Sequence, residues 1–440
     1  MKKIIICILI SSICFSASAK EDLKIAINKS AEGIWTLKYK SKDSIKKIAF
    51  KRNPDNSRLK RWTPISEQFE IIYQDNQEYI VRKDRTEFNQ VRFTLTPTYT
   101  HLAKDYGPFA PFSDGGMLIH SGRFFACVDF CDDDANLWKL SLKVPAKEHI
   151  ILDGKVQSSN VQWEDKNSGQ NIYVGKQQAI ETEDVIAVID VGLPEKIKSS
   201  LSTDIPKMMD YFRKRLGKMP YANKPTLYAS YAKIEGNSSQ GGTLPNQIFM
   251  HWNTNNLESQ VKKSNFINQT TWFFAHEVAH LYQGNKNGGL GHDASQSWIH
   301  EGNADMLASL VLLDLYPESK AYVESKFKSS KKHCINGLSK MALADAADNG
   351  QFGLYYSCGL FIHSAIDIAV KNKSQSKKNI YTIWNEYRSN VSHGKPADQE
   401  TFLTVVNKYA SEELSVKIKE FVSSSFEQPS IIIDRLAAPN

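Results

Sequence analysis

Apolar residues in the first half of the chain occur in short runs with turn residues between them. Runs of this kind, rich in β-branched and aromatic residues, are typical of β-strands. They lie at residues 71–73, 79–81, 91–95, 140–144 and 185–191. Long stretches with helical spacing are scarce before residue 195. The first half therefore predicts a β-rich domain.

From residue 204 onward the apolar positions recur every three or four residues, which is the spacing of amphipathic helices. This pattern predicts helices at residues 205–216, 270–283, 297–315, 354–370 and 377–389, and a strand at residues 227–231. The fold class is therefore α+β. We expect an N-terminal β-sandwich or saddle-like domain over residues 20–200 and a mostly helical domain over residues 201–440.

The N-terminus has the organisation of a secretory signal. Two lysines precede an apolar stretch over residues 4–13, and residues 17–19 (Ala-Ser-Ala) form a small-residue cleavage site. The apolar stretch is shorter than the roughly 20 residues that a membrane-spanning helix needs. We expect cleavage after Ala19, a periplasmic or secreted protein, and no stable membrane insertion afterwards. The signal does not distinguish the periplasm from the extracellular space.

Cleavage after Ala19 leaves four cysteines, which are Cys127, Cys131, Cys334 and Cys358. An even number in an oxidising compartment predicts two disulfides. Four cysteines allow three pairings, and we favour the local pairs 127–131 and 334–358. A zinc knuckle is the alternative, but one close pair of cysteines is too few ligands for such a site.

Composition and charge indicate a folded protein that does not bind nucleic acid. Apolar residues make up 41% of the chain and charged residues 23%, as in globular proteins. The 55 basic residues exceed the 48 acidic residues by seven, and no run of five basic residues occurs. A basic excess spread this thinly is not the pattern of a nucleic-acid-binding surface. The sequence gives no indication of the oligomeric state.

A metal-binding pattern lies in the predicted helix at residues 270–283. His276-Glu-Val-Ala-His280 is an HExxH motif, and residues four apart share one face of a helix. Two imidazoles on one face can bind the same zinc ion, and Glu277 is placed to take a proton from water at the metal. A motif this short arises by chance in about one such chain in a hundred, so a further ligand is needed.

Glu301 supplies the third ligand that a catalytic zinc site needs. It opens the next predicted helix, in the stretch Trp298-Ile-His-Glu-Gly-Asn-Ala-Asp305. Asp305 lies four residues later on the same face, where it can hydrogen-bond a ligand imidazole; the alternative is a solvated helix carboxylate. The pattern predicts one Zn²⁺ per chain, held by His276, His280 and Glu301.

These motifs resemble those of the aminopeptidase N family of gluzincin zinc metallopeptidases. Residues 276–285 (HEVAHLYQGN) look like the family's HExxHxWFGN stretch, and residues 298–304 (WIHEGNA) like its WLxEGFA stretch. The resemblance implies a thermolysin-like metallopeptidase domain in which Glu277 is the general base. Twenty residues separate His280 from Glu301, where the family usually has eighteen.

The resemblance also implies a tyrosine that stabilises the developing oxyanion. The family carries this tyrosine in a Y-x-K-G stretch, and Tyr356-Ser-Cys-Gly359 matches it with Cys358 in place of the lysine. A phenol aimed at the oxyanion supplies the hydrogen bond that a tetrahedral intermediate requires. The adjacent Tyr355 faces another way on a helix, and a purely structural tyrosine is the alternative interpretation.

Gly241 and Gly242 lie where the family has its G-x-M-E-N stretch, within residues 240–246 (QGGTLPN). Glycines let a substrate backbone approach an edge strand closely, so we expect both to contact substrate. The glutamate that holds a free substrate amine in the family is absent, and Leu244 or Pro245 lies near its place.

The sequence as a whole predicts a secreted or periplasmic zinc peptidase that acts on peptides or proteins and is most similar to aminopeptidases. The missing glutamate leaves two alternatives open: a zinc endopeptidase with an open cleft, and a non-catalytic peptide-binding module on the same fold. The resemblance extends to about residue 370, and 70 residues follow. They are too few for the large C-terminal helical domain of longer family members, so we expect a more open site.

Overall fold

The computed structural model describes residues 23–437 except residues 54, 103–104, 133–136 and 285–292. The predicted signal peptide, residues 1–19, lies outside the described residues. So does most of the glycine-rich loop between the two zinc-binding motifs.

Three β-sheets make up the N-terminal half. The first has six strands in the order β14 (Asn160–Lys166), β11 (Leu137–Lys143), β1 (Leu23–Lys29), β2 (Trp35–Ile45), β7 (Phe88–Leu95) and β4 (Trp62–Pro64). The second has four, in the order β10 (Ala126–Val128), β3 (Lys47–Phe50), β6 (Gln77–Arg82) and β5 (Phe69–Gln74). The third has five, in the order β13 (Lys155–Gln157), β12 (His149–Leu152), β15 (Asn171–Gly175), β9 (Met117–His120) and β8 (Phe109–Pro111). Two short helices, α1 (Arg58–Arg61) and η1 (Ser121–Phe124), connect them.

Alternation of buried and exposed residues explains these strands. In β1, Leu23, Ile25 and Ile27 are buried while the residues between them are exposed or half-exposed. This is the pattern of a sheet with one face on a core. The predicted β-rich first half is confirmed, and β5, β6, β7 and β11 lie at four of the predicted strand positions.

A fourth sheet begins before residue 200 and continues beyond it. Its order is β16 (Ile180–Glu181), β17 (Ile186–Ile189), β18 (Thr226–Tyr231), β20 (Gln247–Thr254) and β19 (Asn237–Leu244). Strands β17, β18 and β20 are parallel, and β19 pairs with β20 as an antiparallel edge strand. Helix α2 (Glu195–Leu216) runs through residue 200. We therefore propose that the second domain begins near residue 180 rather than at residue 201.

Helices dominate the remainder of the chain. They are α3 (Leu257–Gln260), α4 (Ser264–Gln283), η2 (Ala294–Gln296), α5 (Trp298–Leu315), η3 (Pro317–Ser319), α6 (Lys320–Leu338), η4 (Leu343–Ala346), α7 (Gly353–Ser374), α8 (Ile380–Ser392), α9 (Gln399–Tyr409), α10 (Glu412–Ser423) and α11 (Pro429–Ala437). The predicted helices after residue 204 correspond to α2, α4, α5, α7 and α8, and α2 begins ten residues earlier than predicted.

Helices α5 and α7 are packed unusually closely at two glycines. A Cβ atom on Gly302 would lie 2.4 Å from the Cα atom of Gly359, and one on Gly359 would lie 2.7 Å from the Cα atom of Gly302. Any larger side chain at either position would push the helices apart. This contact places the start of α5, with Glu301, directly beside the first turns of α7, with Tyr356.

Helix α7 is, among the described residues, the one helix long and apolar enough to span a membrane. About two thirds of its most apolar window, 67%, is buried inside the molecule. Its apolar composition therefore fits a core helix packed against α5 and α6.

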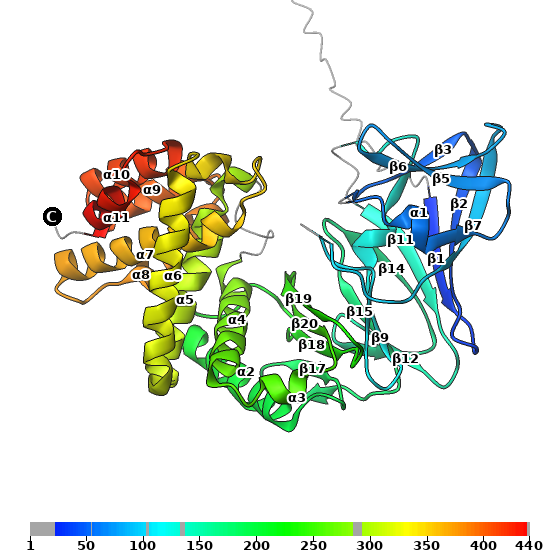
Figure 1. Cartoon of the computed structure of the whole chain (residues 1–440), viewed down its shortest axis with the longest axis horizontal. Coiled ribbons are helices and arrows are strands. Elements are labelled where there is room, and N and C mark those ends of the chain that lie inside the picture. The colour runs from blue at the N-terminus through cyan, green and yellow to red at the C-terminus, as the bar shows by residue number, and fades with distance from the viewer. Residues whose placement is uncertain (1–22, 54, 103–104, 133–136, 285–292, 438–440) are drawn as a thin grey trace, which may run out of the picture.

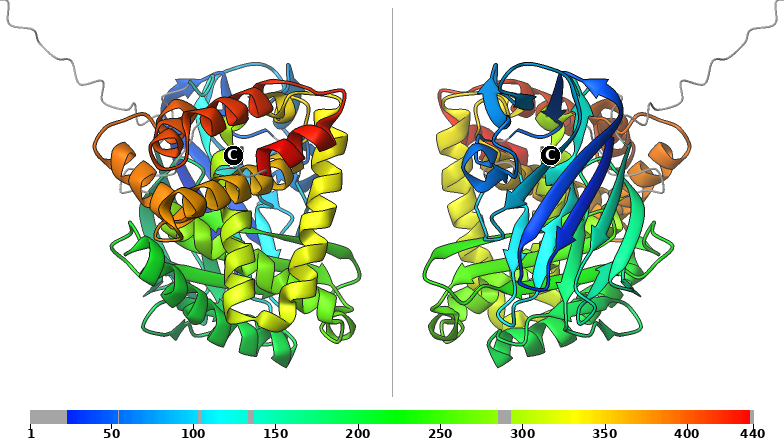
Figure 2. Two further views of the ribbon diagram at one scale, coloured as in Figure 1. Left: turned by 90° about the vertical axis from the view of Figure 1, so that its left-hand side faces the viewer. Right: turned by 90° about the vertical axis from the view of Figure 1, so that its right-hand side faces the viewer.

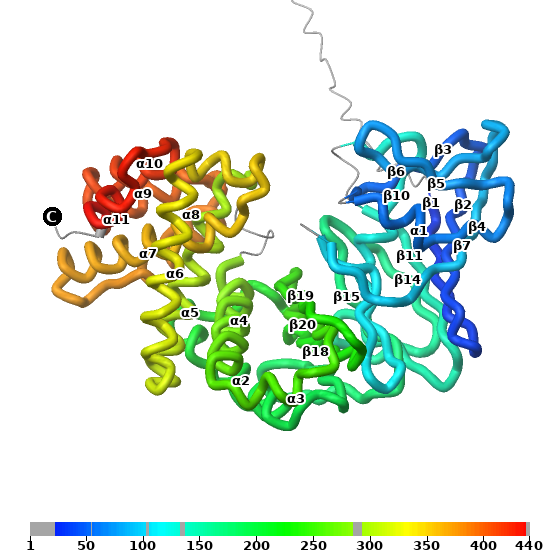
Figure 3. Tube along the Cα trace, viewed as in Figure 1, coloured from blue at the N-terminus to red at the C-terminus, as the bar shows by residue number. Residues whose placement is uncertain are grey.

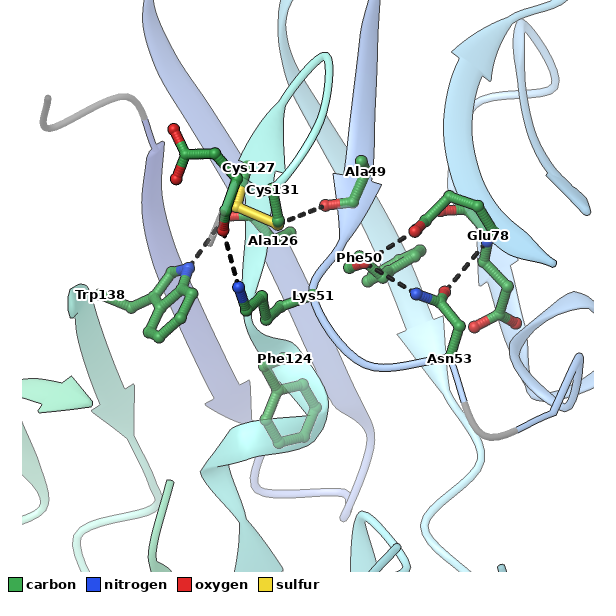
Figure 4. Close-up of a disulfide and its surroundings, with 12 residues drawn as sticks. Ala49, Phe50, Lys51, Asn53, Glu78, Phe124, Ala126, Cys127, Cys131 and Trp138 are labelled. Atoms are coloured by element: carbon green, nitrogen blue, oxygen red, sulfur yellow. Dashed lines mark hydrogen bonds between the residues drawn. A yellow bond between two sulfur atoms is a disulfide. The ribbon is translucent and has the colours of Figure 1, made fainter. Parts of the chain in front are cut away.

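The two predicted local disulfides are both present. Cys127–Cys131 closes the turn after β10, where the Cys131 sulfur lies 3.7 Å from the Ala49 carbonyl oxygen and Trp138 donates a hydrogen bond to the Ala126 carbonyl (Figure 4). Cys334–Cys358 joins α6 to α7. Two disulfides among four cysteines fit an oxidising compartment.

The fourth sheet, with α2, α3 and α4, lies between the N-terminal strands and the C-terminal helices (Figures 1 and 3). Seen from its two ends, the molecule presents helices on one side and strands on the other (Figure 2).

Buried Asp190 joins the halves, because its carboxylate accepts hydrogen bonds from the backbone N–H groups of Ser113 and Tyr231. Burial raises the pKa of Asp190.

Candidate functional site

Helices α4 and α5 bring the three predicted metal ligands together. The Nε2 atoms of His276 and His280, one turn apart on α4, lie 3.0 Å from each other. Glu301 lies in the first turn of α5, and its Oε2 atom is 3.1 Å from each of these nitrogens. Helical spacing aligns the two imidazoles, whereas only the packing of α5 on α4 brings the carboxylate to them.

The donor atoms fit one zinc ion. Ligand atoms about 2.0–2.1 Å from a tetrahedral zinc are about 3.3–3.4 Å apart, and the triangle of His276, His280 and Glu301 has sides of 3.0 to 3.1 Å. Two imidazoles and one carboxylate are also a donor set of catalytic zinc sites, which keep a fourth position open. The group can therefore bind Zn²⁺.

Hydrogen bonds from behind orient both imidazoles. Asp305 Oδ1 lies 3.0 Å from Nδ1 of His276, which is the contact predicted for it, and the same oxygen accepts a hydrogen bond of 2.9 Å from Trp272 Nε1. Gln283 Oε1 lies 2.7 Å from Nδ1 of His280. Each Nδ1 therefore carries the proton, and each Nε2 presents a lone pair to a metal.

The role of Gln283 was not predicted from the sequence. Its amide nitrogen donates to the His300 carbonyl and to Asn303 Oδ1, which turns its oxygen toward His280. A signal was available, because Gln283 follows His280 by three residues and so lies on the same side of the helix. Asn303, where the family usually has phenylalanine, completes this arrangement.

The electrostatics of the site favour a positive charge between the ligands. Burial lowers the pKa of His276, but Asp305 and Glu301 outweigh it and hold that pKa well above its ordinary value. Burial raises the pKa of Glu301, but the histidines around it hold that pKa well below its ordinary value. A metal ion must compete with protons here, so metal affinity falls as the pH is lowered.

The carboxylate of Glu277 lies beside the metal ligands and is held by β19. Its Oε2 atom is 2.7 Å from Thr243 Oγ1, and Glu277 is 7% exposed. Thr243 was not predicted from the sequence, since nothing in the spacing of residues 240–246 connects it with α4. The contact fixes one carboxylate oxygen.

Tyr356 lies in the first turn of α7 with its ring stacked on His276, at a centroid distance of 5.5 Å and an interplanar angle of 22°. Burial, and then the charges of Glu301 and Glu277, raise its pKa well above the ordinary value, so the phenol is protonated and can donate. Tyr355 points away: it is fully buried, and its oxygen accepts a hydrogen bond from the Ala347 N–H group.

Gly241 and Gly242 lie on the edge strand β19, but their neighbours give a further reason for glycine. A Cβ atom on Gly241 would come within 2.4 Å of the Phe273 ring, and one on Gly242 within 2.5 Å of the hydroxyl of Tyr106. Tyr106 belongs to the N-terminal half and is a third residue, after Gln283 and Thr243, that was not predicted from the sequence. The charges of Glu277 and Glu301 contribute to its raised pKa, after burial.

Gln240 fixes the loop that carries Tyr106 to this strand. Its side chain accepts a hydrogen bond from the Gly107 N–H group and donates to the Asp105 carbonyl. The N-terminal half therefore contributes a phenol to the neighbourhood of the site. No spacing rule connects residue 106 with residues 276–301, so the sequence carried no signal for it.

A cavity of about 620 Å³ opens from these groups. Its wall contains the chemical groups His276, Glu277, Asp305 and Tyr356 together with Gly241. The other lining residues are Gln269, Trp272, Phe273, Tyr322, Lys326, Ser329, Ser330, His333, Gly353 and Ser357. The cavity can hold a ligand of a few residues in contact with His276, Glu277 and Tyr356.

Substituting Asp305 by Asn tests the hydrogen bond behind His276. We expect zinc affinity to fall about 10–100-fold, because the amide supports the required imidazole tautomer less well. Competition against a chelator of known affinity measures this. Asp314→Asn, at the exposed far end of the same helix, is the control; equal zinc affinity in the two variants would contradict the assigned contact.

Comparisons with known proteins identify the fold. No family model matches the sequence, and no curated protein matches it by sequence. Solved structures do match. An aminopeptidase N family protein from Idiomarina loihiensis is 11% identical with a TM-score of 0.66, over 94% of this chain and 78% of that one.

Two further matches are an M1 zinc metallopeptidase from Deinococcus radiodurans, solved with a Tyr-Ser-Ala substrate, and leukotriene A4 hydrolase from Saccharomyces cerevisiae. The first is 13% identical with a TM-score of 0.53, over 92% of this chain and 93% of that one. The second is 12% identical with a TM-score of 0.53, over 93% and 68%. This chain thus has the fold of the aminopeptidase N (M1) family of gluzincin zinc metallopeptidases, in a two-domain form.

Proposed function

We propose that the protein is a zinc-dependent peptidase that hydrolyses peptide bonds. The observation that carries the proposal is a triangle of metal-ligating atoms with the Glu277 carboxylate beside it and the Tyr356 phenol stacked on His276. His276, Glu277 and Tyr356 all line one cavity. The match to solved M1 zinc metallopeptidases supports it. The M1 fold alone does not give the activity, so the site carries the argument.

The residues of the chain divide the work of hydrolysis. Bound Zn²⁺ at His276, His280 and Glu301 would supply Lewis acidity, which lowers the pKa of water to about 7. Glu277, fixed by Thr243 through one oxygen, takes the proton of the attacking water and passes it to the leaving amine. Tyr356 donates a hydrogen bond to the oxygen on which negative charge develops.

Aminopeptidase-like action is the form of the proposal that we favour, because the fold is that of aminopeptidases. One element is different: Leu244 or Pro245 lies near the place where the resemblance leads one to expect a glutamate for the substrate amine. Leu244 is buried in a core cluster and cannot serve this purpose. Aminopeptidase action must therefore be distinguished from endopeptidase action by experiment.

We further propose that the mature protein works in the periplasm or outside the cell. The basic, apolar and small-residue segments of residues 1–19 support export, and so do the two disulfides. Mass spectrometry of the protein purified from its host would give the new N-terminus; an intact Met1 would contradict the proposal.

The test of the peptidase proposal is digestion of a mixed peptide library, read by mass spectrometry with and without a zinc chelator. We expect cleavage that the chelator removes and added Zn²⁺ restores. Products shortened by one residue at a time from the N-terminus indicate an aminopeptidase, whereas internal cuts or cleavage of N-terminally blocked peptides indicate an endopeptidase. One zinc per chain without any cleavage would contradict the peptidase and favour a peptide-binding module.

A further inference from the structure

The cavity extends from the catalytic groups along one face of α6. Tyr322, Lys326, Ser330 and His333 all line it, and they are separated by four, four and three residues, so they form a single stripe on the helix. None of them belongs to the metal-binding motifs. A polar, basic stripe in the wall of a peptidase cavity would contact the substrate and would favour a substrate with a negatively charged group.

Lys326 is the positive charge of this stripe. Its Nζ atom lies 5.4 Å from the centre of the Trp272 ring, and the side chain is half-buried. Trp272 is itself fixed through its hydrogen bond to Asp305. In the described part of the chain, Lys326 forms no ion pair with a carboxylate. The ammonium group is therefore held in the cavity wall by an aromatic ring and is free to pair with a ligand.

The acidic side chains of the same wall already have partners. Glu277 is hydrogen-bonded to Thr243, and Asp305 to Trp272 and His276. Moving either carboxylate to Lys326 would break contacts that orient the catalytic groups. A carboxylate that pairs with Lys326 in this cavity therefore comes from the ligand.

His333 adds a further polar group at the C-terminal end of the stripe. Its Nδ1 atom lies 3.0 Å from Ser357 Oγ, which itself donates to the Gly353 carbonyl. Ser357 therefore accepts from Nδ1–H. A Cβ atom on Gly353 would lie 3.0 Å from Cε1 of His333, so the glycine leaves room for the ring. The neighbouring Cys334–Cys358 disulfide fixes α6 against α7 at this point.

We propose that Lys326, on the stripe of α6 that also carries Ser330 and His333, binds a carboxylate group of the peptide substrate through its ammonium group. The inference rests on the proposed peptidase function and names its substrate class: short peptides that carry a carboxylate within a residue or two of the scissile bond. The C-terminal carboxylate of a di- or tripeptide provides this group, and so does an acidic side chain. Recognition through a carboxylate also fits a site without the glutamate that holds a substrate amine.

Matched substrate pairs test the proposal. The pair Ala-Ala and Ala-Ala-amide differs only in the terminal carboxylate, and the pair Ala-Asp-amide and Ala-Asn-amide only in a side-chain carboxylate. For at least one pair we expect kcat/KM to be about tenfold or more higher for the acid. This is the effect expected of one partly buried ion pair between substrate and protein. A preference in the first pair assigns the terminus as the source, and one in the second assigns the side chain.

Variants locate the preference. Lys326→Met should bring the ratio of acid to amide close to one, whereas Lys326→Arg, which keeps the charge, should retain most of it. Lys328→Met is the matched control, because Lys328 lies on the same helix, is exposed and does not line the cavity. Equal rates for both members of both pairs would overturn the proposal, and so would an unchanged ratio in Lys326→Met.

A binding measurement tests the carboxylate site independently of the proposed peptidase activity. Calorimetry of the two pairs with zinc-loaded Glu277→Gln protein measures the carboxylate preference without any hydrolysis. A preference that Lys326→Met removes in this background supports the carboxylate site even if the wild-type protein cleaves no peptide. Cleavage of the library together with equal binding of acids and amides contradicts the carboxylate site and leaves the peptidase standing.

Discussion

Replacing Glu277 by Gln lowers kcat/KM for peptide hydrolysis about 10²–10⁴-fold, and zinc stays bound at one per chain. The amide keeps the size of the side chain and can still contact Thr243, but it cannot take a proton from the attacking water. The metal ligands His276, His280 and Glu301 are untouched, so their triangle of 3.0–3.1 Å remains. Peptide cleavage and metal content are measured on the same preparation.

Glu258→Gln is the control for this substitution. It removes the same charge from an exposed position on the short helix α3, which does not line the cavity, and we expect wild-type activity. Full activity in Glu277→Gln would refute the assigned general base. Loss of zinc in that variant would instead show that Glu277 supports the metal site.

Replacing Tyr356 by Phe lowers kcat about 10²–10³-fold, the usual effect of losing one oxyanion donor, while KM changes little. Phenylalanine retains the ring that stacks on His276, so packing beside the metal ligands is preserved. The lost hydroxyl is needed only when negative charge develops in the transition state, and its loss therefore appears in kcat. Steady-state kinetics on a single peptide measure both constants.

Tyr355→Phe is the matched control, because it removes a hydroxyl from the adjacent residue. That hydroxyl is buried and bonded to the backbone of residues 344 and 347. Its loss should lower the free energy of unfolding by about 0.5–1.5 kcal/mol and leave kcat unchanged. The opposite result, inactive Tyr355→Phe and active Tyr356→Phe, would exchange the roles of the two tyrosines.

The sequence alone determined whatever depends on local spacing. Helical periodicity places His276 and His280 on one face with Glu277 between them, and it aligns Glu301 with Asp305. The alternation of apolar residues identified the strands of the first half, and the short separations within each pair favoured both disulfides. The resemblance carried by the residues around 276–304 named the fold.

Tertiary structure alone decided which distant residues meet. Thr243 hydrogen-bonds Glu277, and the Tyr106 hydroxyl packs against Gly242. Lys326 lines the cavity that His276 and Glu277 also line. No periodicity links these positions in the chain. The same holds for β16 and β17, which join the sheet of the second half although they precede helix α2. Strand pairing and helix packing depend on contacts between whole strands and helices. The free energy of these contacts comes from side-chain surfaces that meet only in the folded chain. The sequence pattern therefore identifies the metal ligands and the catalytic side chains. The residues that orient these side chains and line the cavity are brought to them only by packing of the folded chain.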